Sequence, residues 1–166
     1  MRHIISILMA NEAGALSRVA GLVSARGYNI ESLNVAPTQD ATVSRLTMVT
    51  VGSDEVIDQI NKQLRKLVDV VDLADLTEGA HIEREVLLLK LELPLTAVAE
   101  ALELCTTLGA QALDDTPASF TVEMTGASGE LDDAIARLSA FGPIIEVVRS
   151  GAAAVTCGTD GLKTPD

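Results

Sequence analysis

The feature that most constrains the fold is an order of hydrophobic patterns that occurs twice along the chain. In the first half, strand-like segments are predicted at residues 3–9, 29–36, 42–51 and 68–76. Apolar residues at helical spacing separate the first two of these strands: Leu16, Val19, Ala20 and Val23. A second helical stripe precedes the last strand: Ile57, Ile60, Leu64 and Leu67. The predicted order is βαββαβ.

The second half repeats this order without obvious sequence identity. Strands are predicted at residues 84–93, 110–114, 120–125 and 144–149, and Pro94 marks the start of a helix. The apolar stripe of that helix is Leu95, Val98, Leu102 and Cys105. The stripe of the other helix is Leu131, Ile135 and Leu138.

The repeated order predicts an α+β chain of two ferredoxin-like βαββαβ domains, each with its helices on one face of an antiparallel sheet. We expect the domains at residues 1–77 and 78–158, followed by a flexible tail at 159–166. Small domains of this kind leave one sheet face and one or both sheet edges open. A homodimer is therefore expected.

The composition excludes several classes of function. The formal net charge of −12 argues against a nucleic-acid-binding protein, because binding phosphates requires clustered Lys and Arg. The N-terminus is predicted to be a strand rather than a signal peptide, and no apolar run has the length of a membrane span. The two cysteines, Cys105 and Cys157, are too few for a disulfide framework. A cytoplasmic protein with reduced thiols is expected.

No residue pattern supports catalysis or a metal site. Neither histidine, His3 or His81, has a partner in a catalytic motif. Cys105 has the spacing of a core residue, so a packed thiol is the better interpretation. The acidic pairs at 114–115 and 132–133 are explained by a turn and by a helix N-terminus. We therefore predict no catalytic residue and no metal ligand in this chain.

The segment at residues 11–14 has two possible roles. Asn11 and Gly14 can cap or turn the chain before the first helix, or they can leave helical N–H groups open to a small anion such as an amino-acid carboxylate. Asn29, after the helix, is equally ambiguous. The strand–helix–strand order is expected to bring Asn11 and Asn29 to comparable levels of adjacent elements, near the apolar Leu16 and Ile30. Residue chemistry alone slightly favours the structural role.

Longer strings of sequence resemble a known family. Residues 2–76 resemble the ACT domain, a ligand-binding βαββαβ module. NEAGALSRVAGLVSARGYNIESLNVAPTQD, followed by TVGSDEVIDQINKQLRKLVDVVDL, is similar to the regulatory small subunit of acetolactate synthase (acetohydroxyacid synthase, AHAS). GAHIEREVLLLKLE and IIEVVRSGAAAV are similar to the C-terminal domain of that family.

The resemblance implies a regulatory subunit without chemistry of its own. Such a subunit binds and activates the large catalytic subunit of acetolactate synthase, and it confers feedback inhibition by a branched-chain amino acid, usually valine, on valine and isoleucine biosynthesis. Thiamine diphosphate, FAD and Mg²⁺ are expected in the catalytic subunit and no cofactor in this chain. The effector is expected between the ACT domains of two protomers. The matching positions are Asn11, Ala13, Gly14, Ala15 and Leu16 of one protomer and Asn29 and Ile30 of its neighbour.

Two other classes of function remain open at this stage. One is a free-standing tandem ACT-type amino-acid sensor that acts on another partner. The other is a small ferredoxin-like enzyme, which the shortage of catalytic residues disfavours.

Overall fold

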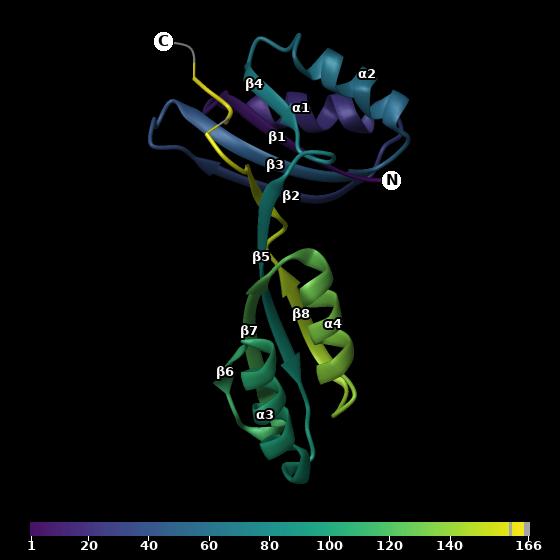
Figure 1. The fold of residues 1–166 in the computed structure, drawn as a ribbon, viewed down its shortest axis with the longest axis vertical. Coiled ribbons are helices and arrows are strands. Elements are labelled where there is room, and N and C mark those ends of the chain that lie inside the picture. The colour runs from purple at the N-terminus through teal and green to yellow at the C-terminus, as the bar shows by residue number, and fades with distance from the viewer. Residues whose placement is uncertain (160, 165–166) are drawn as a thin grey trace. The chain divides into compact units, whose positions relative to one another are not determined.

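A computed structural model describes residues 1–159 and 161–164 of the chain. These residues form two compact units (Figure 1). The first contains Met1–Ile82 together with the described residues from Gly151 onward, and the second contains Glu83–Ser150. The boundaries thus differ from the expected 77/78 and 158, because the chain returns to the first unit after Ser150. Residues 160, 165 and 166 of the predicted flexible tail lie outside the described residues.

The first unit has the predicted βαββαβ order. Its elements are β1 (Arg2–Ala10), α1 (Ala15–Ser24), β2 (Ile30–Pro37), β3 (Val43–Val51), α2 (Asp54–Leu64) and β4 (Val70–Asp75). The strands form an antiparallel sheet in the order β2-β3-β1-β4, so β2 and β4 are its edges. Both helices lie on one face of this sheet (Figure 1).

Strand alternation determines which residues of the first sheet meet the helices. Ile5 and Ile7 of β1 are fully buried in the core formed with α1 and α2. The helices contribute the buried residues Val19, Val23, Ile57, Ile60 and Leu64. The predicted stripe of α2 is therefore confirmed up to Leu64, where the helix ends.

The opposite face of the first sheet is covered by a segment that the sequence did not predict. Ile4 and Val49 point to this face, and they pack with Ala152 and Ala154 in a separate buried cluster. The covering segment includes β9 (Ala153–Thr156), which pairs with β5 (His81–Leu91). Gly151 approaches the sheet closely, since a Cβ at this position would lie 3.2 Å from the Cβ of Ser32. Small residues are needed here because the segment lies directly on the strands.

The second unit repeats the order with its own core. After β5 come a 3₁₀ turn (Leu95–Ala97), α3 (Val98–Leu108), β6 (Gln111–Asp114), a second 3₁₀ turn (Pro117–Ser119), β7 (Phe120–Gly126), α4 (Ser128–Leu138) and β8 (Ile144–Arg149). The sheet order is β6-β7-β5-β8. The fully buried residues are Leu87, Leu89, Leu91, Ala101, Phe120, Val122, Leu131, Ala134 and Leu138. The predicted α+β class with two ferredoxin-like units is confirmed.

Two of the predicted helical stripes are shifted. Leu95 lies in the 3₁₀ turn before α3 and is 78% exposed, so it does not belong to the core as predicted. The buried face of α3 contains Ala101 and Cys105 instead. In α1 the buried positions begin at Ala15, while Leu16 is 37% exposed. A small alanine at the helix start faces the core in place of the larger leucine.

Candidate functional site

The loop between β1 and α1 leaves the N-terminus of α1 open. The N-cap residue is Gly14, which adopts the left-handed conformation with φ +88° and has no side chain to accept a hydrogen bond from the first turn. The Ala15 N–H donates to the carbonyl of Glu12 at 3.3 Å. The N–H groups of Leu16 and Ser17 come next in the first turn. N–H groups at these positions have no carbonyl acceptor within their own helix. This helix start is suited to bind a small anion.

A positive charge is held beside this loop. The Arg18 guanidinium donates to Asp69 through Nε at 2.5 Å and Nη2 at 2.7 Å. The hydrogen bonds from Arg18 hold the pKa of the Asp69 carboxyl below its usual value, and the pKa of Arg18 is raised in turn. A Cβ at Gly14 would lie 2.9 Å from Arg18 Nη1, so the guanidinium lies directly against the glycine. Arg18 is thus placed beside the open end of α1, with its charge paired to Asp69.

Asn11 shapes the loop but does not cap the helix. Its Nδ2 donates to the carbonyl of Ala41 at 2.8 Å, and its backbone N–H donates to the carbonyl of Thr42 at 2.7 Å. These bonds join the loop to the turn between β2 and β3. Asn11 therefore shapes the bend of the chain before α1 and does not cap the helix. The Oδ1 atom of Asn11 is an acceptor available to a ligand ammonium.

The other loop positions contribute in different ways. Ala13 is exposed, and Leu16 is partly exposed on α1. Ala15 is fully buried, so its side chain belongs to the core and only its backbone faces the loop.

Asn29 and Ile30 lie at the other end of the sheet. Ile30 pairs with Thr50 of β3, and the Asn29 carbonyl accepts a hydrogen bond from Thr50 Oγ1 at 2.7 Å. The loop, in contrast, follows Ala10, which pairs with Val43. Seven residues of β3 separate these levels, a distance of ~23 Å.

The prediction that Asn11 and Asn29 reach comparable levels is therefore wrong within one chain. α1 carries the chain back along the sheet, so β2 begins at the end where β1 begins. The Asn29 Nδ2 donates to Glu31 Oε1 at 3.1 Å.

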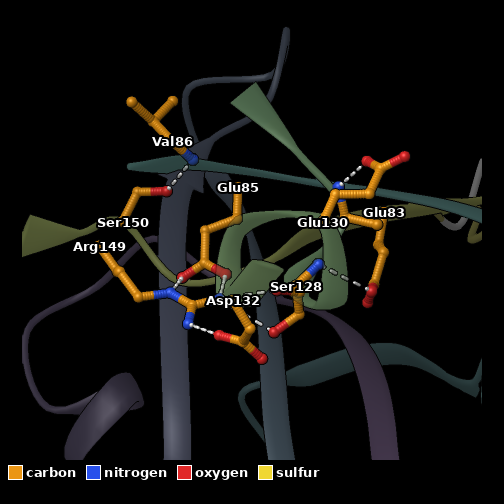
Figure 2. Close-up of polar contacts among 9 residues, drawn as sticks. Glu83, Glu85, Val86, Ser128, Glu130, Asp132, Arg149 and Ser150 are labelled. Carbon is orange, nitrogen blue, oxygen red and sulfur yellow. Dashed lines mark hydrogen bonds and ion pairs between the residues drawn. The ribbon is translucent and has the colours of Figure 1, made fainter. Parts of the chain in front are cut away.

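The second unit contains a polar cluster that sequence reasoning missed (Figure 2). Arg149 of β8 donates to Glu85 of β5 through Nη2 at 2.6 Å and Nε at 3.1 Å. It also binds Asp132 at 2.6 Å and the Ser128 hydroxyl at 3.0 Å, both on α4. The cluster joins two strands to a helix. We interpret it as a structural ion-pair network, because a bidentate guanidinium–carboxylate pair offers no reactive group.

The remaining titratable groups have structural roles. Cys105 is a buried thiol as predicted, and burial raises its pKa. Asp114 accepts hydrogen bonds from Thr116 and Ser119 in a turn, which confirms the turn interpretation. Across residues 1–159 and 161–164, no group of three or more His, Cys, Asp or Glu is placed to hold a metal ion. No helix within the described residues is long and apolar enough to cross a membrane.

Comparisons with known proteins agree with both units. Residues 5–72 match the family described as "AHAS small subunit-like ACT domain", and residues 84–158 match the family "Small subunit of acetolactate synthase".

Two curated relatives match almost end to end. The acetolactate synthase isozyme 3 small subunit of Escherichia coli (strain K12) is 48% identical over 158 residues, which cover 95% of this chain and 97% of that protein. The acetolactate synthase small subunit of Haemophilus influenzae is 45% identical over 162 residues, covering 98% of this chain and 99% of the relative.

A solved structure matches in three dimensions. The crystal structure of the acetolactate synthase small subunit from Thermotoga maritima superposes with a TM-score of 0.84 at 30% identity, covering 96% of this chain and 99% of that one. The resemblance seen in the sequence is confirmed, and the chain belongs to the family of acetolactate synthase small subunits.

Proposed function

We propose that this chain is the cytoplasmic regulatory subunit of acetolactate synthase. It binds the large catalytic subunit, raises its activity and makes it sensitive to inhibition by a branched-chain amino acid, usually valine. Thiamine diphosphate, FAD and Mg²⁺ are held by the catalytic subunit. The observation that supports the proposal is the uncapped start of α1 at Gly14, a helix end suited to bind a small anion, in a chain that matches this family in both units. Asn29, the other proposed contact, lies at the opposite end of the same sheet.

A second copy of the chain can complete the site. β2 is an edge strand, and Pro37 at its end pairs with Ser44, which also pairs with Met9 just before the loop. If two β2 edges pair antiparallel about a two-fold axis, the start of one β2 lies against the end of the other. Asn29 of each copy then comes to the end of the sheet that carries the neighbour's loop. Neighbouring strands are about 4.8 Å apart, and β1 lies two strands in from the β2 edge. The loop that follows β1 therefore lies about 10 Å from the β2 edge.

The groups gathered there match a zwitterionic amino acid with an aliphatic side chain. The effector carboxylate meets the N–H groups of Leu16 and Ser17 beside the Arg18 guanidinium. The ammonium meets Asn11 Oδ1 and the Asn29 amide of the second copy. The partly exposed Leu16 and the partly buried Ile30 of the second copy contact the aliphatic side chain. Each dimer holds two such sites.

Feedback then follows from linked equilibria. Valine bridges two copies and stabilises one arrangement of the dimer, whereas the catalytic subunit binds a different arrangement better. A coupling free energy of about 1–3 kcal/mol between the two binding events gives strong inhibition. The coupling is reciprocal, so saturating catalytic subunit weakens valine binding by the same factor.

Reconstitution tests the proposal. Acetolactate formation is measured for the catalytic subunit alone, with this protein, and with this protein and valine. The expected result is activation by the protein and inhibition by valine only when the protein is present. Valine inhibition of the catalytic subunit alone is the control. If the protein binds valine but leaves the synthase unchanged, the chain is instead an amino-acid sensor for another partner.

A further inference from the structure

Arg18 has one edge of its guanidinium fixed and the rest free. It lies one helical turn after Gly14, whose carbonyl accepts the Arg18 N–H at 3.0 Å. A side chain at this position leans toward the helix start, so the guanidinium reaches Gly14. Nε and Nη2 donate to Asp69 at 2.5 and 2.7 Å. Nη1 carries two further N–H donors, which have no hydrogen-bond acceptor among the described residues.

Asp69 holds the guanidinium in this orientation. Its side chain is only 6% exposed, and a buried carboxylate is costly unless it is paired. The backbone carbonyl of Asp69 accepts the N–H of Ala10, the residue before the loop, at 2.8 Å. The two bonds from Arg18 therefore end on a fixed carboxylate. As a result Nη1 is held against Gly14, 2.9 Å from where a Cβ of that residue would lie.

The pair offers a ligand free donors rather than a net positive charge. Asp69 compensates the charge of Arg18, and the carboxylate of Glu12 in the loop also acts on the guanidinium, since both carboxylates raise the pKa of Arg18. The N–H groups of Leu16 and Ser17 lie at the same end of α1 and have no acceptor within their helix. Side-chain and backbone N–H donors thus lie together beside Gly14.

We propose that Arg18 makes the effector site selective for a carboxylate. Nη1 donates to a carboxylate oxygen of the effector while Nε and Nη2 stay on Asp69, which is the positioning residue. A guanidinium can serve two carboxylates at once, because its five N–H donors lie along different edges of one plane. The inference rests on the proposed function, to which it adds the group that distinguishes an amino acid from its amide. The alternative is an ion pair that only ties α1 to the turn before β4.

The ligands L-valine and L-valinamide separate these two roles. Valinamide keeps the ammonium and the isopropyl group but has a neutral amide in place of the carboxylate. Both are titrated calorimetrically into the full chain, at a pH where both amines are protonated. Since Arg18→Met alone would leave a buried carboxylate unpaired, the test variant combines it with Asp69→Asn. We expect valine binding to weaken by about tenfold or more, with valinamide affinity within about threefold of the parent value.

An ion pair of the second unit provides the matched control. Arg137 pairs with Asp133 at 3.4 Å, and its side chain is 45% exposed, close to the 49% of Arg18. Arg137→Met with Asp133→Asn makes the same two changes and should leave the affinities for both ligands unchanged. Arg18→Lys keeps a cation beside Asp69 and so protects the fold. It should still lose valine affinity selectively, because an ammonium has no second planar edge.

Three results would contradict the proposal. Equal weakening of valine and valinamide would show that the pair only supports the fold. Valine binding by the Arg18 variants as tight as that of the parent would remove Arg18 from the site and leave the proposed function intact. If the parent protein binds no valine, the effector part of the proposed function fails, and the role of Arg18 fails with it.

Discussion

Replacement of Gly14 by aspartate tests the effector site at its most sensitive point. Gly14 is the N-cap of α1, with φ +88°, and it adds no side chain of its own beside the expected ligand carboxylate. Gly14→Asp adds a Cβ and a negative charge at that position. It should therefore abolish effector binding while the fold of the first unit persists.

The structure gives the magnitude of the loss of stability and of the loss of valine affinity. An L-residue in the left-handed region costs about 1–2 kcal/mol of stability. The added Cβ meets only the movable Nη1 end of Arg18, at 2.9 Å, so little further strain is expected. Two carboxylates about 4 Å apart near a protein surface repel by about 4 kcal/mol. Because Arg18 offsets part of this repulsion, we expect valine affinity to fall by at least about a hundredfold.

The assay is calorimetric titration of valine, accompanied by thermal unfolding and by activation of the catalytic subunit. Gly14→Ala is the matched control, since it carries the same backbone strain without the charge. The alanine variant should lose stability by a similar amount but keep most of its valine affinity. Valine binding by Gly14→Asp as tight as that of the parent protein would refute the placement of the carboxylate.

Three further predictions concern the rest of the chain. Arg149→Met removes the two hydrogen bonds to the buried Glu85 and should lower the free energy of unfolding by about 3 kcal/mol, whereas the double variant with Glu85→Leu should recover much of the loss in denaturant titrations. Gly151→Ala places a Cβ against β2 at φ +77° and should lower the melting temperature and speed amide exchange in β2. The hydrogen bonds from Ser119 and Thr116 lower the pKa of Asp114 to about 2, so its contribution to stability is present above the ordinary value of 3.8 and is lost as the pH falls toward 2. Ser119→Ala should raise that pKa, which carboxyl NMR titration measures, and should make the loss of stability on acidification smaller and complete at a higher pH.

The elements that the sequence predicted are those whose hydrophobic period is set by the core. Ile57, Ile60 and Leu64 recur at helical spacing because one face of α2 packs on the sheet. Leu87, Leu89 and Leu91 alternate because one face of β5 meets α3 and α4. Such patterns depend on local backbone geometry, so a short stretch of sequence is enough to predict the helix or strand.

The features that were missed depend on contacts distant in sequence. Gly151 and Ala152 carry no periodic signal, and only the return of the chain to the first sheet explains their small size. Arg149 and Glu85 are 64 residues apart, so nothing local links them. The error at Leu95 has a different origin. Pro94 precedes a 3₁₀ turn, and the α-helix itself begins at Val98.

For the candidate site, the sequence named residues, which stay a prediction, but it did not indicate their arrangement in space. Asn11, Gly14 and Asn29 were identified from turn chemistry and family resemblance, yet their positions within one chain followed only from strand register. The register places the loop and Asn29 at opposite ends of the sheet. That separation is the reason why the proposed site includes a second copy.

The most direct test of this shared site is valine binding by mixed dimers. Gly14→Asp and Asn29→Ala chains are each expected to form homodimers without a competent site. A mixed dimer contains one site with both defects and one site with an intact loop and an intact Asn29. Calorimetry on the mixed, re-equilibrated chains should therefore recover valine binding at near-parental affinity, at one site per mixed dimer. If mixing restores no binding, the loop and Asn29 do not meet across two chains, and the account of the effector site is contradicted.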